Sequence, residues 1–203
     1  SPTSEFGKRT KSTPLGSVDR PMQPLTVALA AEATFVARSV DTHTEHLQHT
    51  LGAAGRHVGS SYVEVLQNCN IFNDGAWRDF TDREVRDDRM LVLEHGKPMI
   101  FGKDRDRGIR LVGLRPEVVV IGQDGIGEAD LLVHDAHAED PYLALILSRM
   151  FWPEFPVPVG VLRDISRPTH DQLIAEQIRT AKEKSGEGDL AKALFAGETW
   201  TVE

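Results

Sequence analysis

One cysteine is the first residue of this chain whose chemistry stands out. Cys69 is the single cysteine among 203 residues, and it follows a short apolar and β-branched run from Tyr62 to Leu66. Such a run predicts a strand buried in a parallel sheet. Loops at the carboxyl ends of such strands are where α/β proteins bind ligands. Cys69 is therefore either a functional group at this edge or a half-buried thiol that packs as a small hydrophobe.

A second group of candidate residues lies near position 135. His134, Asp135, His137 and Asp140 fall within seven positions of one another. Imidazole and carboxylate are common metal ligands, so a mononuclear metal site, as in a metal-dependent hydrolase, is one interpretation. The spacing matches no specific zinc motif, so a strand end that runs into a helix is the alternative.

Four more histidines fall between residues 43 and 57, and three of them are three positions apart. Steps of three drift around a helix, which places these side chains beside or behind its apolar stripe. A solvated helix face is therefore predicted for them rather than a metal site. The four residues are His43, His46, His49 and His57.

The elements around Cys69 read as strand, helix, strand. Residues 34–40 have β-branched character, and Thr42 followed by Glu45 has the spacing of a helix capping box. Apolar residues then recur at helical spacing on one face before the chain enters the strand at Tyr62. A βαβ unit has a right-handed crossover, so its two strands are predicted to be parallel. The predicted apolar face consists of Leu47, Leu51, Ala54 and Val58.

The second half of the chain changes character. Glycine-rich breaks between residues 89 and 125 predict β-hairpins, and helices are predicted from Tyr142 and after Thr169, where Gln172 completes a capping box. Trp200 in a polar tail predicts docking against this subunit or a partner. The expected fold class is α/β: part of a parallel-sheet domain over residues 1–80, with a hairpin-rich and helical extension over 81–203.

Composition restricts the possible partners. The formal net charge of -8 argues against nucleic acid or an anionic membrane surface as the main partner. No apolar run approaches the roughly 18 residues that a membrane span needs. A single cysteine fits a reducing compartment, so a cytoplasmic location is expected. The first 24 residues, rich in proline and poor in aliphatic side chains, read as a loop cut from something longer.

Five stretches together resemble the β subunit of 2-oxoacid:ferredoxin oxidoreductases, and among these the two-subunit 2-oxoglutarate type. The resemblance covers essentially the whole chain, and the motifs occur in the same order. They are SPTS at 1–4, AAEATFVARSV at 30–40, YVEVLQNCNIFNDG at 62–75, LEHGKPMIFGKDRDRGIRL at 93–111 and ETWTV at 198–202.

The resemblance implies a function and two parts of a site. Cys69 matches the fourth ligand of a [4Fe-4S] cluster, and Asn70 replaces the proline that is frequent after it. Ser1, Pro2, Thr3 and Ser4 match a loop that lines the pocket for thiamine diphosphate and the substrate carboxylate. Magnesium, the GDG motif that holds it, and the other three cluster cysteines belong to a family segment that precedes SPTS, and none of them is in this sequence.

The implied reaction is oxidative decarboxylation of a 2-oxoacid with coenzyme A, with electrons passing through the cluster to ferredoxin. The expected protein partners are an α subunit, which supplies the catalytic carboxylate, and the upstream half of the β subunit. This chain alone is expected to be inactive. Two other hypotheses remain: a non-catalytic fragment that acts as a structural module, and a metal-dependent hydrolase that uses His134, Asp135 and His137.

Overall fold

The computed structural model describes residues 3–71, 73–200 and 202. The chain forms two compact units, Ser1–Ser166 and Arg167–Glu203. Within the described residues, no helix is long and apolar enough to cross a membrane. All of the candidate site residues lie in the first unit.

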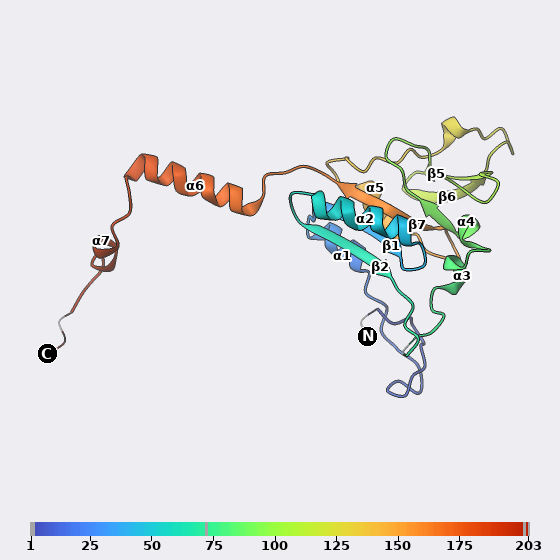
Figure 1. Ribbon diagram of the computed structural model, residues 1–203, viewed down its shortest axis with the longest axis horizontal. Helices are drawn as coiled ribbons and strands as arrows, with labels where there is room; N and C mark the ends of the chain where they lie inside the picture. Colours follow the sequence, from blue (N-terminus) through green and yellow to red (C-terminus); the bar gives the residue numbers. More distant parts are fainter. Residues whose placement is uncertain (1–2, 72, 201, 203) are drawn as a thin grey trace. The chain divides into compact units, whose positions relative to one another are not determined.

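A four-stranded mixed sheet is the centre of the first unit (Figure 1). The strand order is β2-β1-β7-β3, and β1 and β2 pair in parallel from Phe35 opposite Ser61 to Val40 opposite Leu66. β7 runs antiparallel to β1 and parallel to β3. The predicted α/β class and the parallel βαβ pair are confirmed. The strands are β1 (Phe35–Val40), β2 (Ser61–Leu66), β3 (Met90–Val92) and β7 (Val157–Asp164).

Three helices cover the two faces of this sheet. Side chains of a strand alternate between faces, and β1 shows which helix covers which face. Ser39 contacts His46 of α2, whereas Val36 packs in a core cluster with Leu29 of α1 and Leu147 of α5. The sheet is therefore enclosed by α2 on one side and by α1 and α5 on the other. Their bounds are α1 (Pro24–Ala30), α2 (Thr44–Arg56) and α5 (Tyr142–Arg149).

A small antiparallel sheet confirms hairpins in this region, but of the predicted breaks only Gly102-Lys103 is a hairpin turn, between β4 and β5, whereas Arg107-Gly108 lies within β5. β5 pairs with β4 and with β6, and the β5–β6 turn has Gly113 at φ 63 in its first central position, as a type II′ hairpin requires. Short helical turns connect this sheet to the rest of the unit. The elements are α3 (Arg78–Thr81), α4 (Arg86–Arg89), β4 (Ile100–Phe101), β5 (Arg107–Val112), β6 (Arg115–Val120) and the 3-10 turn η1 (Glu128–Asp130).

The structure corrects three predictions about β2 and α2. β2 lies at the edge of the sheet, and only Leu66 in it is buried. Helix α2 has His43 as its N-cap with no side-chain capping bond, so the predicted capping box is absent. Its predicted apolar face is not the face that packs on the sheet: Leu51 is 49% exposed and Val58 66%, whereas Thr50 is buried.

The second unit consists of α6 (His170–Ser185) and α7 (Leu190–Leu194). The predicted capping box of α6 is confirmed, since the Thr169 hydroxyl accepts from the Gln172 N–H and the Gln172 side chain accepts from the Thr169 N–H. Trp200 is 84% exposed. The predicted domain boundary near residue 80 stays a prediction; β1 and β7, from its two sides, share one sheet.

A buried ion pair joins the first two strands. Arg38 Nε donates to Glu64 Oε2 at 2.7 Å, and the two side chains are 3% and 15% exposed. Arg38 also lies over the ring of Phe151, and its Nη1 is buried without a partner among the described residues. Removal of one member of such a pair leaves a charge in a poorly solvated place, which costs more than the pair contributes.

We expect Glu64→Gln to lower the free energy of unfolding by about 3–5 kcal/mol, because Arg38 would keep its charge without a carboxylate. Urea denaturation measures this change. The matched control is Glu117→Gln, since Glu117 pairs with Arg110 across β5 and β6 with both side chains well exposed, and its loss should cost at most about 1 kcal/mol. Equal losses in the two variants would contradict the assignment.

Candidate functional site

The loop that carries Cys69 begins where β1 and β2 end together. The N–H of Asp41 donates to the carbonyl of Leu66 at 3.3 Å, and the Asp41 carboxylate accepts from the N–H of Asn68 at 2.9 Å. The indole N–H of Trp77 bonds to the carbonyl of Gln67 on the same loop. The first residues of the loop are thus tied to the carboxyl end of the sheet, as predicted for a functional edge.

The side chain of Asn68 closes the loop. Its Nδ2 donates to Asp74 Oδ1 at 2.9 Å, and its Oδ1 accepts from the N–H of Gly75 at 2.8 Å. Gly75 has φ 76, in agreement with the predicted turn at Asn73-Asp74-Gly75. Inside the closed loop the N–H of Asn73 bonds to the carbonyl of Cys69 at 2.9 Å. Cys69 is therefore held on a short, cross-braced loop.

The thiol of Cys69 is half-buried at this position. A thiolate is a soft donor that suits zinc or an iron-sulfur centre, and this place leaves it reachable from outside the loop. Within the described residues, no three His, Cys, Asp or Glu side chains are arranged to hold a metal ion. Whether Cys69 is a ligand is therefore not decided by neighbouring metal-binding side chains among the described residues.

The N-terminal segment meets the Cys69 loop. Lys8 Nζ donates to Asn73 Oδ1 at 2.7 Å, a contact between residues 65 positions apart. Of the predicted cofactor residues, Thr3 is exposed and Ser4 is half-buried, whereas Ser1 and Pro2 lie outside the described residues. The structure thus brings the segment that follows SPTS to the Cys69 loop. Lys8 itself was missed from the sequence, because a lysine in a polar loop carries no signal of its contact.

His134 and His137 serve to fasten a loop to β7. His134 is 1% exposed and its Nε2 lies 2.7 Å from the Val161 carbonyl, so Nε2 donates. His137 Nδ1 bonds in the same way to the Asp164 carbonyl. Each ring thus directs one nitrogen at a backbone oxygen of β7. The structure supports the alternative of a structural segment for residues 134–140, and among the described residues it assembles no metal site there.

Of the histidines predicted to lie on a solvated face of α2, His46 packs against the sheet, which corrects the prediction for that residue, whereas His49 is exposed as predicted. His46 Nδ1 lies 2.8 Å from Ser39 Oγ, and burial, followed by the nearby His43 and His49, lowers the pKa of His46. Thr50, on the same face, is buried. A polar inner face is stable here because Ser39 of β1 supplies a hydrogen-bond partner for the buried imidazole.

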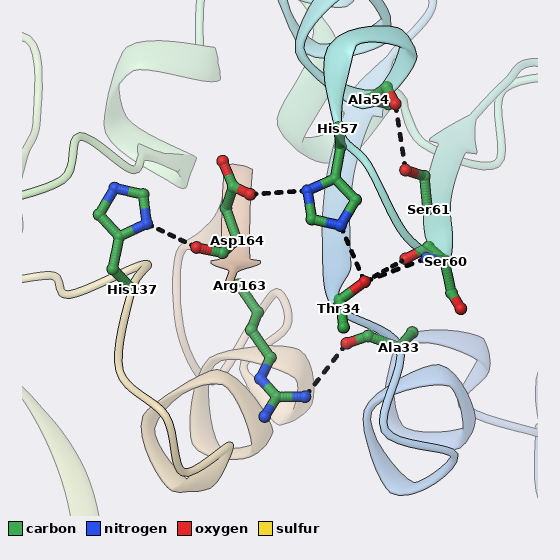
Figure 2. A network of polar contacts seen from close by, with 9 residues as sticks. All are labelled: Ala33, Thr34, Ala54, His57, Ser60, Ser61, His137, Arg163 and Asp164. Atoms are coloured by element: carbon green, nitrogen blue, oxygen red, sulfur yellow. Dashed lines mark hydrogen bonds and ion pairs between the residues drawn. The ribbon is translucent and has the colours of Figure 1, made fainter. Parts of the chain in front are cut away.

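His57 connects the end of α2 with the start of β1 and the end of β7 (Figure 2). Its Nδ1 lies 2.9 Å from Asp164 Oδ1 at the end of β7, and its Nε2 lies 2.8 Å from Thr34 Oγ1 just before β1. The Thr34 hydroxyl also accepts from the N–H of Ser60 and contacts the Ser60 carbonyl. The order hydroxyl, imidazole, carboxylate is that of a nucleophilic triad.

The surroundings of Thr34 favour a structural clip over a nucleophile. Its oxygen has three close partners, and a Cβ on Gly59 would lie 2.3 Å from it, so the backbone of Gly59 covers it. Beside it, Arg163 is 1% exposed and donates to the carbonyls of Ala33 and Glu139. Figure 2 shows the Arg163 side chain reaching from β7 to the carbonyl of Ala33, before β1, and the Asp164 carboxylate directed at His57. The network lies at the amino end of β1, whereas Cys69 follows the carboxyl ends of β1 and β2.

A cleft of about 600 Å³ opens beside β3 and β4. Its wall combines apolar residues such as Met99 and Phe101 with three cationic and three acidic side chains, and it includes part of the motif at 93–111. The cationic residues are Arg86, Lys97 and Arg105. The acidic residues are Asp87, Glu94 and Glu128, so the charged side chains of the lining balance and its charge favours neither an anion nor a cation. The volume is that of a small-molecule site.

The comparisons with known proteins confirm the resemblance to β subunits of 2-oxoacid:ferredoxin oxidoreductases. The chain is 41% identical over 206 residues to the 2-oxoglutarate oxidoreductase subunit KorB of Mycobacterium tuberculosis, which covers 100% of this chain and 54% of that relative. It is 39% identical over 94 residues to the 2-oxoacid:ferredoxin oxidoreductase 1 subunit beta of Aeropyrum pernix, covering 46% of the chain and 28% of the relative. No model of a protein family matches the chain.

A solved structure shares the fold. It is described as the 2-oxoglutarate:ferredoxin oxidoreductase from Magnetococcus marinus with 2-oxoglutarate, coenzyme A and succinyl-CoA bound. The TM-score is 0.58 at 23% identity, over 97% of this chain and 50% of that one. The chain thus spans about half the length of the Mycobacterium tuberculosis relative and of the Magnetococcus marinus structure.

Acid should destabilise the first unit through its buried histidines. Burial lowers the pKa of both His46 and His134, so below roughly pH 6.5 the unfolded chain binds protons that the folded chain does not. Stability is then complete above that pH and falls as the pH drops. His134→Gln should reduce the fall between pH 7.5 and 5 in urea titrations, whereas His170→Gln, at an exposed position, should not. An unchanged slope in His134→Gln would contradict this.

Asn68→Ala should loosen the Cys69 loop without unfolding the sheet. The substitution removes the acceptor of the Gly75 N–H and the donor to Asp74, which costs about 1 kcal/mol locally. Amide hydrogen exchange at Gly75 should become about fivefold faster, while the amides of β1 keep their protection. Asn70→Ala, at the exposed neighbour of Cys69, is the control. Equal exchange in the two variants would show that Asn68 does not close the loop.

Proposed function

We propose that this chain is part of the β subunit of a 2-oxoglutarate:ferredoxin oxidoreductase. The observation that carries the proposal is the 41% identity to a KorB subunit along the whole chain, with Cys69 presented on a braced loop at the carboxyl end of β2. The reaction converts a 2-oxoacid, coenzyme A and two oxidised ferredoxins to an acyl-CoA, carbon dioxide, a proton and two reduced ferredoxins.

In this proposal Cys69 contributes one thiolate to a [4Fe-4S] cluster. The cluster supplies a one-electron carrier between the decarboxylation and ferredoxin. Cys69 suits this task because Asn68 and Asp41 hold its loop at the edge of the sheet. In the proposal, the remaining ligands are the three cysteines that the resemblance places in the family segment before SPTS. The [4Fe-4S] assignment rests on the resemblance and on the donor chemistry of one thiol.

The segment Ser1 to Ser4 is proposed to line the pocket of thiamine diphosphate and magnesium, with the upstream half of the β subunit holding the diphosphate. Thiamine diphosphate supplies the electron sink for the loss of carbon dioxide. Lys8 places the following segment beside the Cys69 loop, so the two cofactors would be neighbours.

The partner subunits follow from the same proposal. The relatives are named as β subunits, and an α subunit would supply the catalytic carboxylate. The exposed apolar side chains of α6, such as Leu173 and Ile178, leave surface for such contacts. An acidic chain of net charge -8 does not favour nucleic acid as a partner.

Cys69→Ser tests the proposal in the complete assembly with both subunits present. Serine replaces a soft thiolate by a poorly ionised hydroxyl, so iron per active site, visible absorbance and ferredoxin reduction should fall severalfold or more, with thiamine diphosphate still bound. The melting temperature should change little, because the loop is at the sheet edge.

Asn70→Ala in the same loop is the control and should retain its iron. A thiol that only packs as a hydrophobe would leave iron intact in Cys69→Ser and cost about 1 kcal/mol of stability. Full iron content in that variant would therefore refute the assignment of Cys69.

A further inference from the structure

The segment that contains Lys8 forms a closed loop of its own. The N–H of Gly7 donates to the Ser17 carbonyl at 2.7 Å, and the N–H of Ser17 donates to the Lys8 carbonyl at 3.0 Å. Gly16 has φ 103, and a Cβ there would lie 2.9 Å from the Gly7 oxygen, so only glycine allows this closure. Lys8 therefore stands at the neck of a braced loop, where its backbone position is restricted.

The Lys8 side chain leads from this neck to the Cys69 loop. Its Nζ donates to Asn73 Oδ1 at 2.7 Å and pairs with Glu5 Oε2 at 3.3 Å. The N–H of Asn73 in turn bonds to the Cys69 carbonyl. Two hydrogen bonds in series, from Lys8 to Asn73 and from Asn73 to the carbonyl of Cys69, thus connect the N-terminal loop with the proposed ligand. A hydrogen bond from a charged donor is stronger than a neutral one, so this contact can hold two loops together.

We propose that Lys8 is a positioning residue that docks the N-terminal loop on the Cys69 loop. The role in catalysis rests on the proposed function, in which Thr3 and Ser4 line the thiamine diphosphate pocket and Cys69 binds the cluster. Because Lys8 joins the loops that carry these residues, it would keep the two cofactor sites in one relative position. Displacement of catalytic groups by about 1 Å lowers the activity of cofactor sites, so a contact that fixes the position of the two loops would contribute to activity. The contact itself involves only residues of this chain.

The test compares Lys8→Met, which keeps the length of the side chain and loses its donor, with Lys8→Arg, which keeps a donor. Lys11→Met is the matched control, because Lys11 is an exposed lysine of the same loop. Two quantities are measured on the 203-residue chain: amide exchange across residues 67–76 and the rate of Cys69 alkylation by iodoacetamide. Both should rise about tenfold in Lys8→Met, as expected for loss of one charged hydrogen bond.

Lys8→Arg should restore most of the protection, and Lys11→Met should behave as the parent. Combining Lys8→Met with Asn73→Ala should add little to either single change, since both remove the same contact. In the complete assembly, loss of the cation near the proposed cluster should make its reduction potential more negative. Lys8→Met identical to Lys11→Met, or uniformly faster exchange throughout the first unit, would overturn the proposal.

The two hypotheses fail separately. If Cys69→Ser retains all its iron while Lys8→Met still loosens residues 67–76, the docking contact stands and the cluster assignment is wrong. If Cys69→Ser loses its iron while Lys8→Met leaves exchange and alkylation unchanged, the cluster assignment stands and the role of Lys8 is wrong.

Discussion

Strand β1 is the constraint on which the rest of the first unit depends. All six of its residues are buried, and it is hydrogen-bonded to β2 on one side and β7 on the other. Polar side chains within and beside β1 make three hydrogen bonds to other parts of the unit. Thr34, before the strand, bonds to His57; Ser39, within it, bonds to His46; and Asp41, after it, accepts from Asn68. The bond between Ser39 and His46 is sheltered by the sheet, where an unpaired polar group costs about 1–3 kcal/mol, whereas the bond between Asp41 and Asn68 is exposed.

The two ends of β1 have different tasks. At its amino end, His57, Asp164 and Arg163 form a network that joins β1, α2 and β7. At its carboxyl end, Asp41 helps to build the loop of Cys69. The triad-like geometry at the first end and the single cysteine at the second show why residue type alone is a weak guide. The three close partners of the Thr34 oxygen argue for a clip, whereas the half-burial of Cys69 is compatible with either role, and its assignment as a ligand rests on the family resemblance.

The proposed cofactor site is assembled from pieces distant in the chain. Lys8 and Asn73 are 65 positions apart, and the contact between them places the N-terminal segment beside the cluster-ligand loop. The matched relative from Mycobacterium tuberculosis is about twice as long as the aligned region. In the proposed function, the described residues of this chain supply one thiolate, from Cys69, and the hydrogen bonds that hold its loop.

The sequence by itself determined the features that depend on local chemistry. The parallel pair β1–β2, the β4–β5 hairpin with Gly102 in its turn and the capping box at Thr169 follow from short-range patterns, and each was predicted. The turn at Gly113 was not among the predicted breaks. The order of motifs was also sufficient to indicate the family resemblance, which the comparisons confirm.

Only the tertiary structure decided which face of α2 packs on the sheet. Its apolar stripe predicted that Leu51 and Val58 would be buried, yet His46 and Thr50 face the sheet and those apolar residues are exposed. Hydrophobic periodicity depends on the residues of the helix alone. It cannot predict that Ser39 of β1 supplies the hydrogen-bond partner that stabilises the His46 imidazole against the sheet. The same holds for Lys8 and His57, whose contacts join residues far apart in sequence and so depend on the packed fold.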